Sequence, residues 1–250
     1  MTDFQKFNFI NNKVIINCMA KDIKNAQEIL TAAEGHVAIG LLSTRFPTTE
    51  ENIIEVREFM KTIPLISVGL GGGSPKQWQM AARIAASTDP GHVNQVFPAA
   101  GYTKGLLEGN NCRNTVVNAL ISPTGNVGKV KINTGLYSQV NTEEIDLNTA
   151  LLMMKDIGLQ SVKFFNMKGL RSLDELKRVA QGCKDVGIDM IEPTGGLNPD
   201  NLQEILETCL SSGVKYIMPH VYSSIIDKTT GRTKPEEVSK IINMIKKLVG

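Results

Sequence analysis

The sequence predicts an α/β fold, a (β/α)8 TIM barrel, from three observations. Short apolar runs alternate with longer amphipathic stretches along most of the chain. This alternation favours parallel strands joined by right-handed helical crossovers. The length of 250 residues is typical of one such barrel. A doubly wound open sheet is the alternative for the same alternation.

The first four predicted strands are each followed by a helical pattern. Thr48 and Glu51 form a capping box at the start of the second helix, and Pro75 suits the first turn of the third. The strands are expected at 14–18, 37–42, 65–70 and 92–97, and the helices at 22–34, 48–60, from 74 onward and near 101–108.

The alternation breaks between residues 109 and 140. Two strand-like runs, 115–121 and 128–133, flank the glycine-containing stretch "SPTGNVG". Because nine strand candidates are one too many for an eight-stranded barrel, we expect one run in the barrel and the other in an extra β-hairpin excursion. The remaining strands are expected at 161–165, 189–192 and 215–219, with helices from 172, from 199 and over 234–248.

Composition indicates a single globular domain over residues 1–250. The chain is 42% apolar, with 27 basic and 25 acidic residues, a balance that favours neither a nucleic acid nor a membrane as partner. No apolar run approaches the ~18–20 residues of a membrane span. Four cysteines without metal-ligand spacing, and a start without a secretion signal, predict a cytoplasmic protein.

Active sites of such barrels lie at the carboxyl ends of the strands. His36 and His92 stand at strand starts and are expected to be structural or solvated, whereas His220 follows the last strand and is a candidate to touch substrate. One histidine on this face does not make a metal site. Asn17 on the first strand and Arg45 after the second are further candidates, Arg45 as an anion clamp or a solvated loop residue.

Lys163 lies inside the apolar strand "SVKFF" with no acidic residue within three positions. Burial of an unpaired ammonium is costly, so such a lysine either reaches water or loses its proton. The neutral amine is a nucleophile that attacks ketones. A lysine that extends through the barrel mouth to water, without a covalent role, is the alternative.

The stretch "EPTGGL" at 192–197 follows a predicted strand and opens a helix. Gly195 and Gly196 let backbone N–H groups approach an anion, which predicts a phosphate site with Thr194. Ser223, after the last strand, is expected to contribute its hydroxyl. The second glycine cluster, "GLGGGSP", lacks the spacing of a dinucleotide motif, and no cofactor is expected.

These motifs resemble a known enzyme family. "VKFFNMKG" followed by "EPTGGLNPDN" resembles the lysine strand and phosphate loop of the class I 2-keto-3-deoxy-6-phosphogluconate (KDPG) aldolases, and "SVGLGGGSPKQ" and "STRFP" are similar to two further segments of them. Over nearly its whole length the chain is similar to KDGP aldolase family proteins, which share the EPTGG loop and an ending like "PHVYSSIIDK".

The resemblance implies cleavage of a phosphorylated keto-sugar acid to pyruvate and D-glyceraldehyde 3-phosphate. It implies a Schiff base on Lys163, a phosphate site at Thr194, Gly195 and Gly196 with Ser223, and contact of Arg45 with the substrate carboxylate. A homo-oligomer is also expected.

The chain departs from the KDPG aldolases at two places. Leu41 stands where they carry a catalytic glutamate, and Gly72 where they carry a threonine. Glu192 occupies the cysteine position of their phosphate loop and is our candidate for the proton shuttle, or it pairs with a cation and orders the loop. Remaining alternatives are an aldolase for 4-hydroxy-2-oxoglutarate or another unphosphorylated keto acid, a phospho-sugar isomerase, and a non-catalytic barrel that binds a phosphate ligand.

Overall fold

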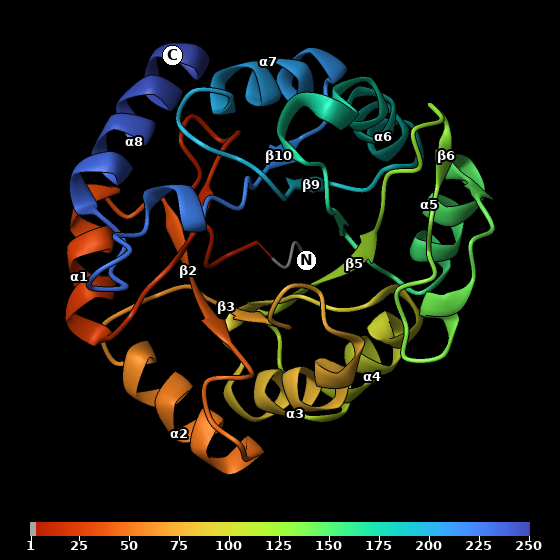
Figure 1. Cartoon of the computed structure of the whole chain (residues 1–250). Coiled ribbons are helices and arrows are strands. Elements are labelled where there is room, and N and C mark those ends of the chain that lie inside the picture. The colour runs from red at the N-terminus through yellow and green to blue at the C-terminus, as the bar shows by residue number, and fades with distance from the viewer. Residues whose placement is uncertain (1–3) are drawn as a thin grey trace.

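A computed structural model describes residues 4–250 and contains one curled sheet of eight parallel strands (Figure 1). The strands follow one another in the order β1-β2-β3-β4-β5-β8-β9-β10. Parallel bridges Val14–Ile217 and Asn17–His220 join the two edges, so the sheet closes into a TIM-barrel-like ring. The strands are β1 (Ile16–Met19), β2 (Val37–Leu42), β3 (Ile66–Gly69), β4 (Gly91–Val93), β5 (Val116–Ile121), β8 (Ser161–Phe164), β9 (Met190–Pro193) and β10 (Tyr216–Ile217).

Helices cover the outside of the ring. The predicted capping box is confirmed, since the Thr48 side chain accepts from the Glu51 backbone and the Glu51 carboxylate from the Thr48 backbone. The sequence pattern did not reveal α5. The helices are α1 (Ile23–Ala32), α2 (Thr49–Met60), α3 (Trp78–Thr88), α4 (Ala100–Gly109), α5 (Leu147–Asp156), α6 (Leu173–Val186), α7 (Leu202–Ser212) and α8 (Pro235–Val249).

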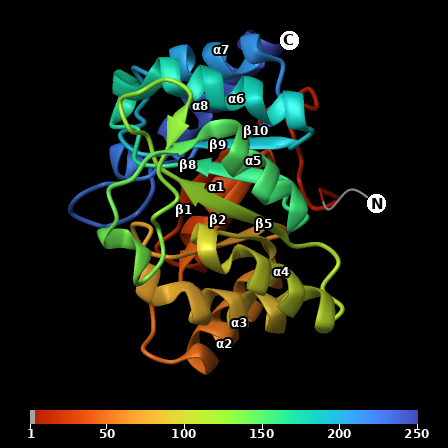
Figure 2. The same ribbon diagram turned by 90° about the vertical axis from the view of Figure 1, so that its right-hand side faces the viewer.

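The expected hairpin at 109–140 takes a different form. Residues of 115–121 form the barrel strand β5, and a single antiparallel bridge, Ser122–Lys131, follows it. The short strand β6 (Lys129–Val130) then pairs with β7 (Ile145–Asp146), outside the range we expected. Figure 2 places this segment toward one end of the barrel and the chain before β1, from residue 4 on, toward the other.

An apolar cluster fills the barrel at the amino-terminal ends of the strands. The chain before β1 contributes Phe4 and Phe7, which are 7% and 8% exposed. Their rings meet edge to face, with centroids 5.2 Å apart, and close this end of the barrel. The other members come from the strands and their starts: Ile15, Ala38, Leu65, Val116, Met190, Tyr216 and Met218.

Polar side chains form the next layer of the interior. Side chains alternate between the two faces of a strand, so a residue two positions after a cluster member faces the same interior, one step nearer the carboxyl ends. On five strands or their extensions, the residue two positions after a cluster member is polar and buried. These residues are Asn17, Ser67, Asn118, Glu192 and His220. The barrel therefore has an apolar floor and a polar middle.

Strand β8 places side chains both in the outer core and in the barrel interior. Phe164 is fully buried in the outer core between the sheet and the helices, while Lys163 and Phe165 line the interior cavity. The expected common orientation of Lys163 and Phe165 is therefore confirmed. The helices between residues 4 and 250 lack the combination of length and apolar character needed to cross a membrane.

We expect Phe164→Ala to lower the free energy of unfolding by about 3–5 kcal/mol, because the change leaves a cavity among packed apolar atoms. Leu170→Ala is the matched control, since Leu170 is 41% exposed and should cost under about 1 kcal/mol. Urea unfolding followed by circular dichroism compares the two. Equal losses would contradict the assignment of Phe164 to the outer core.

Candidate active site

A cavity of about 270 Å³ opens at the carboxyl ends of the strands. Its wall combines the interior side chain of β8 with loops that follow β3, β9 and β10. Of the residues singled out from the sequence, it brings together Lys163, Thr194, Gly195, Gly196, His220 and Ser223.

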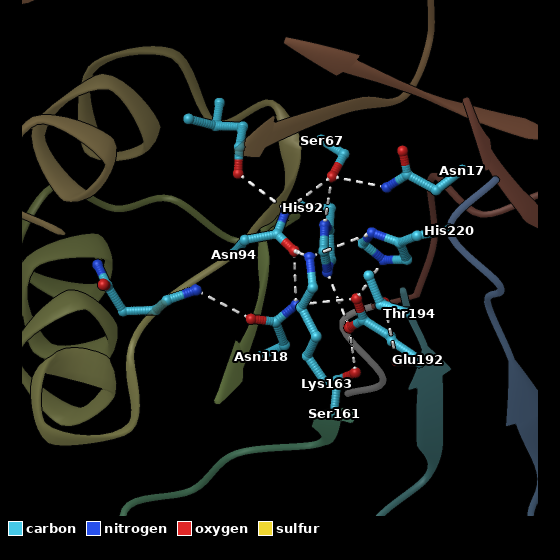
Figure 3. Close-up of polar contacts among 12 residues, drawn as sticks. Asn17, Ser67, His92, Asn94, Asn118, Ser161, Lys163, Glu192, Thr194 and His220 are labelled. Atoms are coloured by element: carbon cyan, nitrogen blue, oxygen red, sulfur yellow. Dashed lines mark hydrogen bonds and ion pairs between the residues drawn. The ribbon is translucent and has the colours of Figure 1, made fainter. Parts of the chain in front are cut away.

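Lys163 presents its amine to this cavity from the middle of β8 (Figure 3). Its Nζ donates to Asn94 Oδ1 at 2.8 Å and lies 3.2 Å from His220 Nδ1. Within residues 4–250 no other acceptor contacts Nζ. Each of the two hydrogens of the neutral amine thus has an acceptor, and only the nitrogen lone pair is left without a hydrogen-bond partner.

Burial lowers the pKa of Lys163 to about 8, although the negative charge of Glu192 acts to raise it. A pKa in this range gives a usable fraction of neutral amine near pH 7. The acceptors at 2.8 and 3.2 Å fix the amine without adding a charge beside it. The position of Lys163 favours a nucleophile over a cation that reaches water.

Glu192 is fully buried in the polar layer of the barrel interior and does not line the cavity. Its two oxygens accept four hydrogen bonds, from His92 Nε2 at 3.0 Å, from Asn118 Nδ2 and His220 Nε2 at 2.8 Å each, and from the Ser161 hydroxyl. A carboxylate saturated in this way has no direct route to a substrate. Its position therefore argues against Glu192 as the proton shuttle that contacts substrate.

Hydrogen-bond accounting fixes the protons on both histidines. Each Nε2 faces the Glu192 carboxylate, which only accepts, so each Nε2 carries a hydrogen. The Ser67 hydroxyl accepts from Asn17 Nδ2 at 2.8 Å and Asn94 Nδ2 at 3.1 Å, so its own hydrogen goes to His92 Nδ1 at 2.8 Å. His92 is therefore a neutral, structural residue, and it is buried rather than solvated.

The ionised state of Glu192 follows from these donors. Burial alone would raise the pKa of Glu192, but the interactions with His92 and His220 outweigh it and hold that pKa well below its usual range. Burial and the nearby Lys163 lower the pKa of His220 to about 3. The site thus holds one carboxylate and a neutral His220 imidazole whose Nδ1 faces Lys163 Nζ at 3.2 Å and the Tyr222 hydroxyl at 2.8 Å.

The glycine loop after β9 has a backbone conformation that requires glycine. Gly195 and Gly196 have φ of 102° and 73°, and a Cβ on Gly195 would lie 2.1 Å from Asn166 Oδ1. Their carbonyls accept from the Gly169 backbone and from Asn201 Nδ2, both at 2.9 Å. In the described part of the chain their N–H groups have no acceptor. Only glycine fits here, and it leaves two donors open.

Two other predicted residues have different surroundings. Ser223 lines the cavity and is exposed, with no hydrogen-bond partner among residues 4–250. Arg45 does not reach the cavity. Its Nε donates to both carboxylate oxygens of Glu55 at 2.8 Å, and its other nitrogens donate to the carbonyls of Ala20 and Lys21. Its position gives the expected contact with a substrate carboxylate no support.

Comparison with known proteins identifies the family. A sequence model of the KDGP aldolase family matches residues 10–229. A 2-dehydro-3-deoxy-phosphogluconate aldolase of Salmonella typhimurium (strain 14028s / SGSC 2262) is 48% identical over 246 residues, which are 98% of this chain and 100% of that protein.

The chain belongs to the KDGP aldolase family. Solved structures similar to it include a thiamine phosphate pyrophosphorylase of Pyrococcus furiosus (TM-score 0.59, 14% identity, 96% of this chain and 98% of the other). KGPDC from Streptococcus mutans is another (TM-score 0.59, 14% identity, 95% and 100%). At 14% identity, the similarity to these two structures shows only that this KDGP aldolase family member shares their fold.

Sequence reasoning missed three residues of the hydrogen-bond network at the site, namely Asn94, Asn118 and Tyr222, of which Asn94 contacts the amine itself. The signal was available for two of them, since Asn94 and Asn118 are polar residues within or beside apolar strands, as Lys163 is. Tyr222 gave no such signal. In residues 4–250 no group of three or more His, Cys, Asp or Glu side chains is arranged to hold a metal ion.

We expect Glu192→Gln to lower the free energy of unfolding at pH 7 by about 2–4 kcal/mol, because an amide cannot accept from all four donors. The depressed pKa means that the carboxylate contributes stability above its unfolded-state value of 4.5, and that this contribution falls as the pH drops toward the folded-state value. The variant should therefore lose less stability than the wild type between pH 7 and pH 3. Urea unfolding across this range measures both, and parallel curves would contradict the ionised state.

Proposed function

We propose that this protein is a class I aldolase that cleaves 2-keto-3-deoxy-6-phosphogluconate to pyruvate and D-glyceraldehyde 3-phosphate through a Schiff base on Lys163. The observation that carries the proposal is the half-buried Lys163 amine, held by two neutral acceptors in the wall of a cavity. The curated Salmonella relative, similar over its full length, supports the choice of substrate.

In the proposed reaction the neutral amine attacks the C2 keto group, and loss of water with uptake of one proton gives a protonated imine. The imine draws electrons from the C3–C4 bond as the C4 hydroxyl loses its proton, which releases the aldehyde and leaves an enamine of pyruvate. Asn94 Oδ1, 2.8 Å from Nζ, accepts the single N–H of the imine. Protonation at C3 and hydrolysis then release pyruvate.

The phosphate is proposed to sit on the glycine loop. Lys163 is the one lysine or arginine in the described cavity wall, so backbone N–H groups of Gly195 and Gly196 and the Ser223 hydroxyl supply the remaining donors. Such donors favour an anion without a paired cation. Thr194 contributes less directly, because its hydroxyl donates to the Glu192 carbonyl at 3.1 Å. We further propose that the chain is a single domain over 1–250 that works in the cytoplasm as a homo-oligomer.

Borohydride reduction in the presence of pyruvate should attach a pyruvate-derived group to Lys163, identified by peptide mass spectrometry. Lys163→Ala should remove the adduct, and Lys168→Ala, a change of an exposed lysine five positions away, should keep it. Because the neutral amine is the reactive form, the initial rate of trapping should rise with pH and level off above about 8. A folded wild type without any adduct would refute the Schiff-base mechanism.

Ser223→Ala should raise the KM for the phosphorylated substrate roughly tenfold, the usual effect of one lost hydrogen bond to a charged group. The KM for the same keto acid without its phosphate should not change, so steady-state kinetics on the two substrates form the test. Equal effects on both would remove Ser223 from the phosphate site.

A further inference from the structure

A row of three groups leads from the cavity to the buried carboxylate. The Tyr222 hydroxyl lies in the cavity wall, 2.8 Å from His220 Nδ1, and His220 Nε2 lies 2.8 Å from Glu192 Oε2. Glu192 itself does not reach the cavity. The row therefore runs from a phenol through an imidazole to a carboxylate.

We propose that Tyr222 and His220 move the protons of carbon–carbon bond cleavage and that Glu192 is the residue that positions His220. The substrate class is a 4-hydroxy-2-keto acid bound to Lys163 as an imine, so the inference rests on the proposed function. It gives the proton shuttle, for which the sequence suggested Glu192, to residues that line the cavity.

The contacts of Lys163 change in a way that suits this role. As an amine it has two acceptors, Asn94 Oδ1 at 2.8 Å and His220 Nδ1 at 3.2 Å. As an imine it keeps one N–H, which the nearer acceptor Asn94 retains. His220 Nδ1 is then left to the Tyr222 hydroxyl, so formation of the imine itself frees the base.

The cleavage step balances in protons and charge. The C4 hydroxyl gives its proton to Tyr222 Oη while Tyr222 gives its own to His220 Nδ1. The C3–C4 bond breaks, its electron pair forms the enamine C2=C3 bond, and the imine nitrogen becomes neutral. The positive charge thus passes from the imine to the imidazole, whose Nε2–H already faces the Glu192 carboxylate. The reverse transfer delivers the proton to C3 of the enamine.

Surroundings of the phenol support a relay rather than a stable phenolate. Burial and the charge of Glu192 raise the pKa of Tyr222 well above its usual value, so the phenol keeps one hydrogen at all times. Asn17 Oδ1 lies 3.2 Å from the same hydroxyl and gives it a second acceptor in the resting state. Tyr222 therefore accepts a proton only as it passes one on.

Two measurements on Tyr222→Phe separate this role from imine formation. Borohydride trapping of pyruvate on Lys163 reports the imine, and exchange of the pyruvate methyl hydrogens for deuterium, followed by NMR, reports proton transfer at C3. The variant should trap pyruvate as the wild type does and exchange at least about 100-fold more slowly. Tyr137→Phe, at a tyrosine that is 86% exposed, is the matched control and should leave both unchanged.

His220→Gln is the second variant, since its amide still donates to Glu192 but supplies no base, and it should lose exchange as well. Exchange at the wild-type rate in Tyr222→Phe would overturn the relay and leave the proposed aldolase intact. Hydrogen exchange at the wild-type rate in a folded His220→Gln variant would overturn the proposed role of His220 in proton transfer. A wild type that forms no imine would refute the proposed function itself. Borohydride trapping detects this outcome separately from hydrogen exchange.

Discussion

The interior of this barrel is organised around one buried charge. An isolated carboxylate in an apolar core costs several kcal/mol, and Glu192 is compatible with the fold only because four donors reach it. These donors are themselves held, since the Ser67 hydroxyl fixes the His92 ring and the Gln95 backbone N–H fixes the Asn118 amide. The strands must keep their register for all of these contacts to coexist.

The chemistry of the amine follows from the same arrangement. Residue Lys163 pairs in register with Glu192 on the neighbouring strand, and the carboxylate stabilises its ammonium form while burial opposes it. The opposing effects of burial and of the Glu192 charge together give Lys163 a pKa of about 8. Replacement of the carboxylate would shift this balance as well as the packing, so reactivity and stability are linked in this barrel.

Local pattern predicted the parts of the structure that depend on local chemistry. The apolar runs located the strands of the sheet, the Thr48 capping box located a helix start, and the glycine pair marked a loop that only glycine fits. The partners of Glu192 were beyond such reasoning, because they come from four strands or their extensions and His92 is 100 positions away. The surroundings of Arg45 could not be predicted for a related reason. Its partner Glu55 lies on the following helix, where nothing in the sequence distinguishes it from other surface acids.

The apolar floor built by Phe4 and Phe7 has a kinetic consequence. In the described part of the chain the cavity opens at the end opposite to this floor, so in the proposed reaction substrate and both products would use the same passage. Lys163 is half-buried whereas Gly196 and Ser223 are exposed, so in the proposed reaction the covalent end of the bound molecule lies inward and its phosphate end outward. The aldehyde fragment of that proposed reaction comes from the outer end and departs while the inner fragment is still attached to Lys163. The proposed covalent link and the closed floor together would impose an order of product release, with the covalently held fragment leaving last.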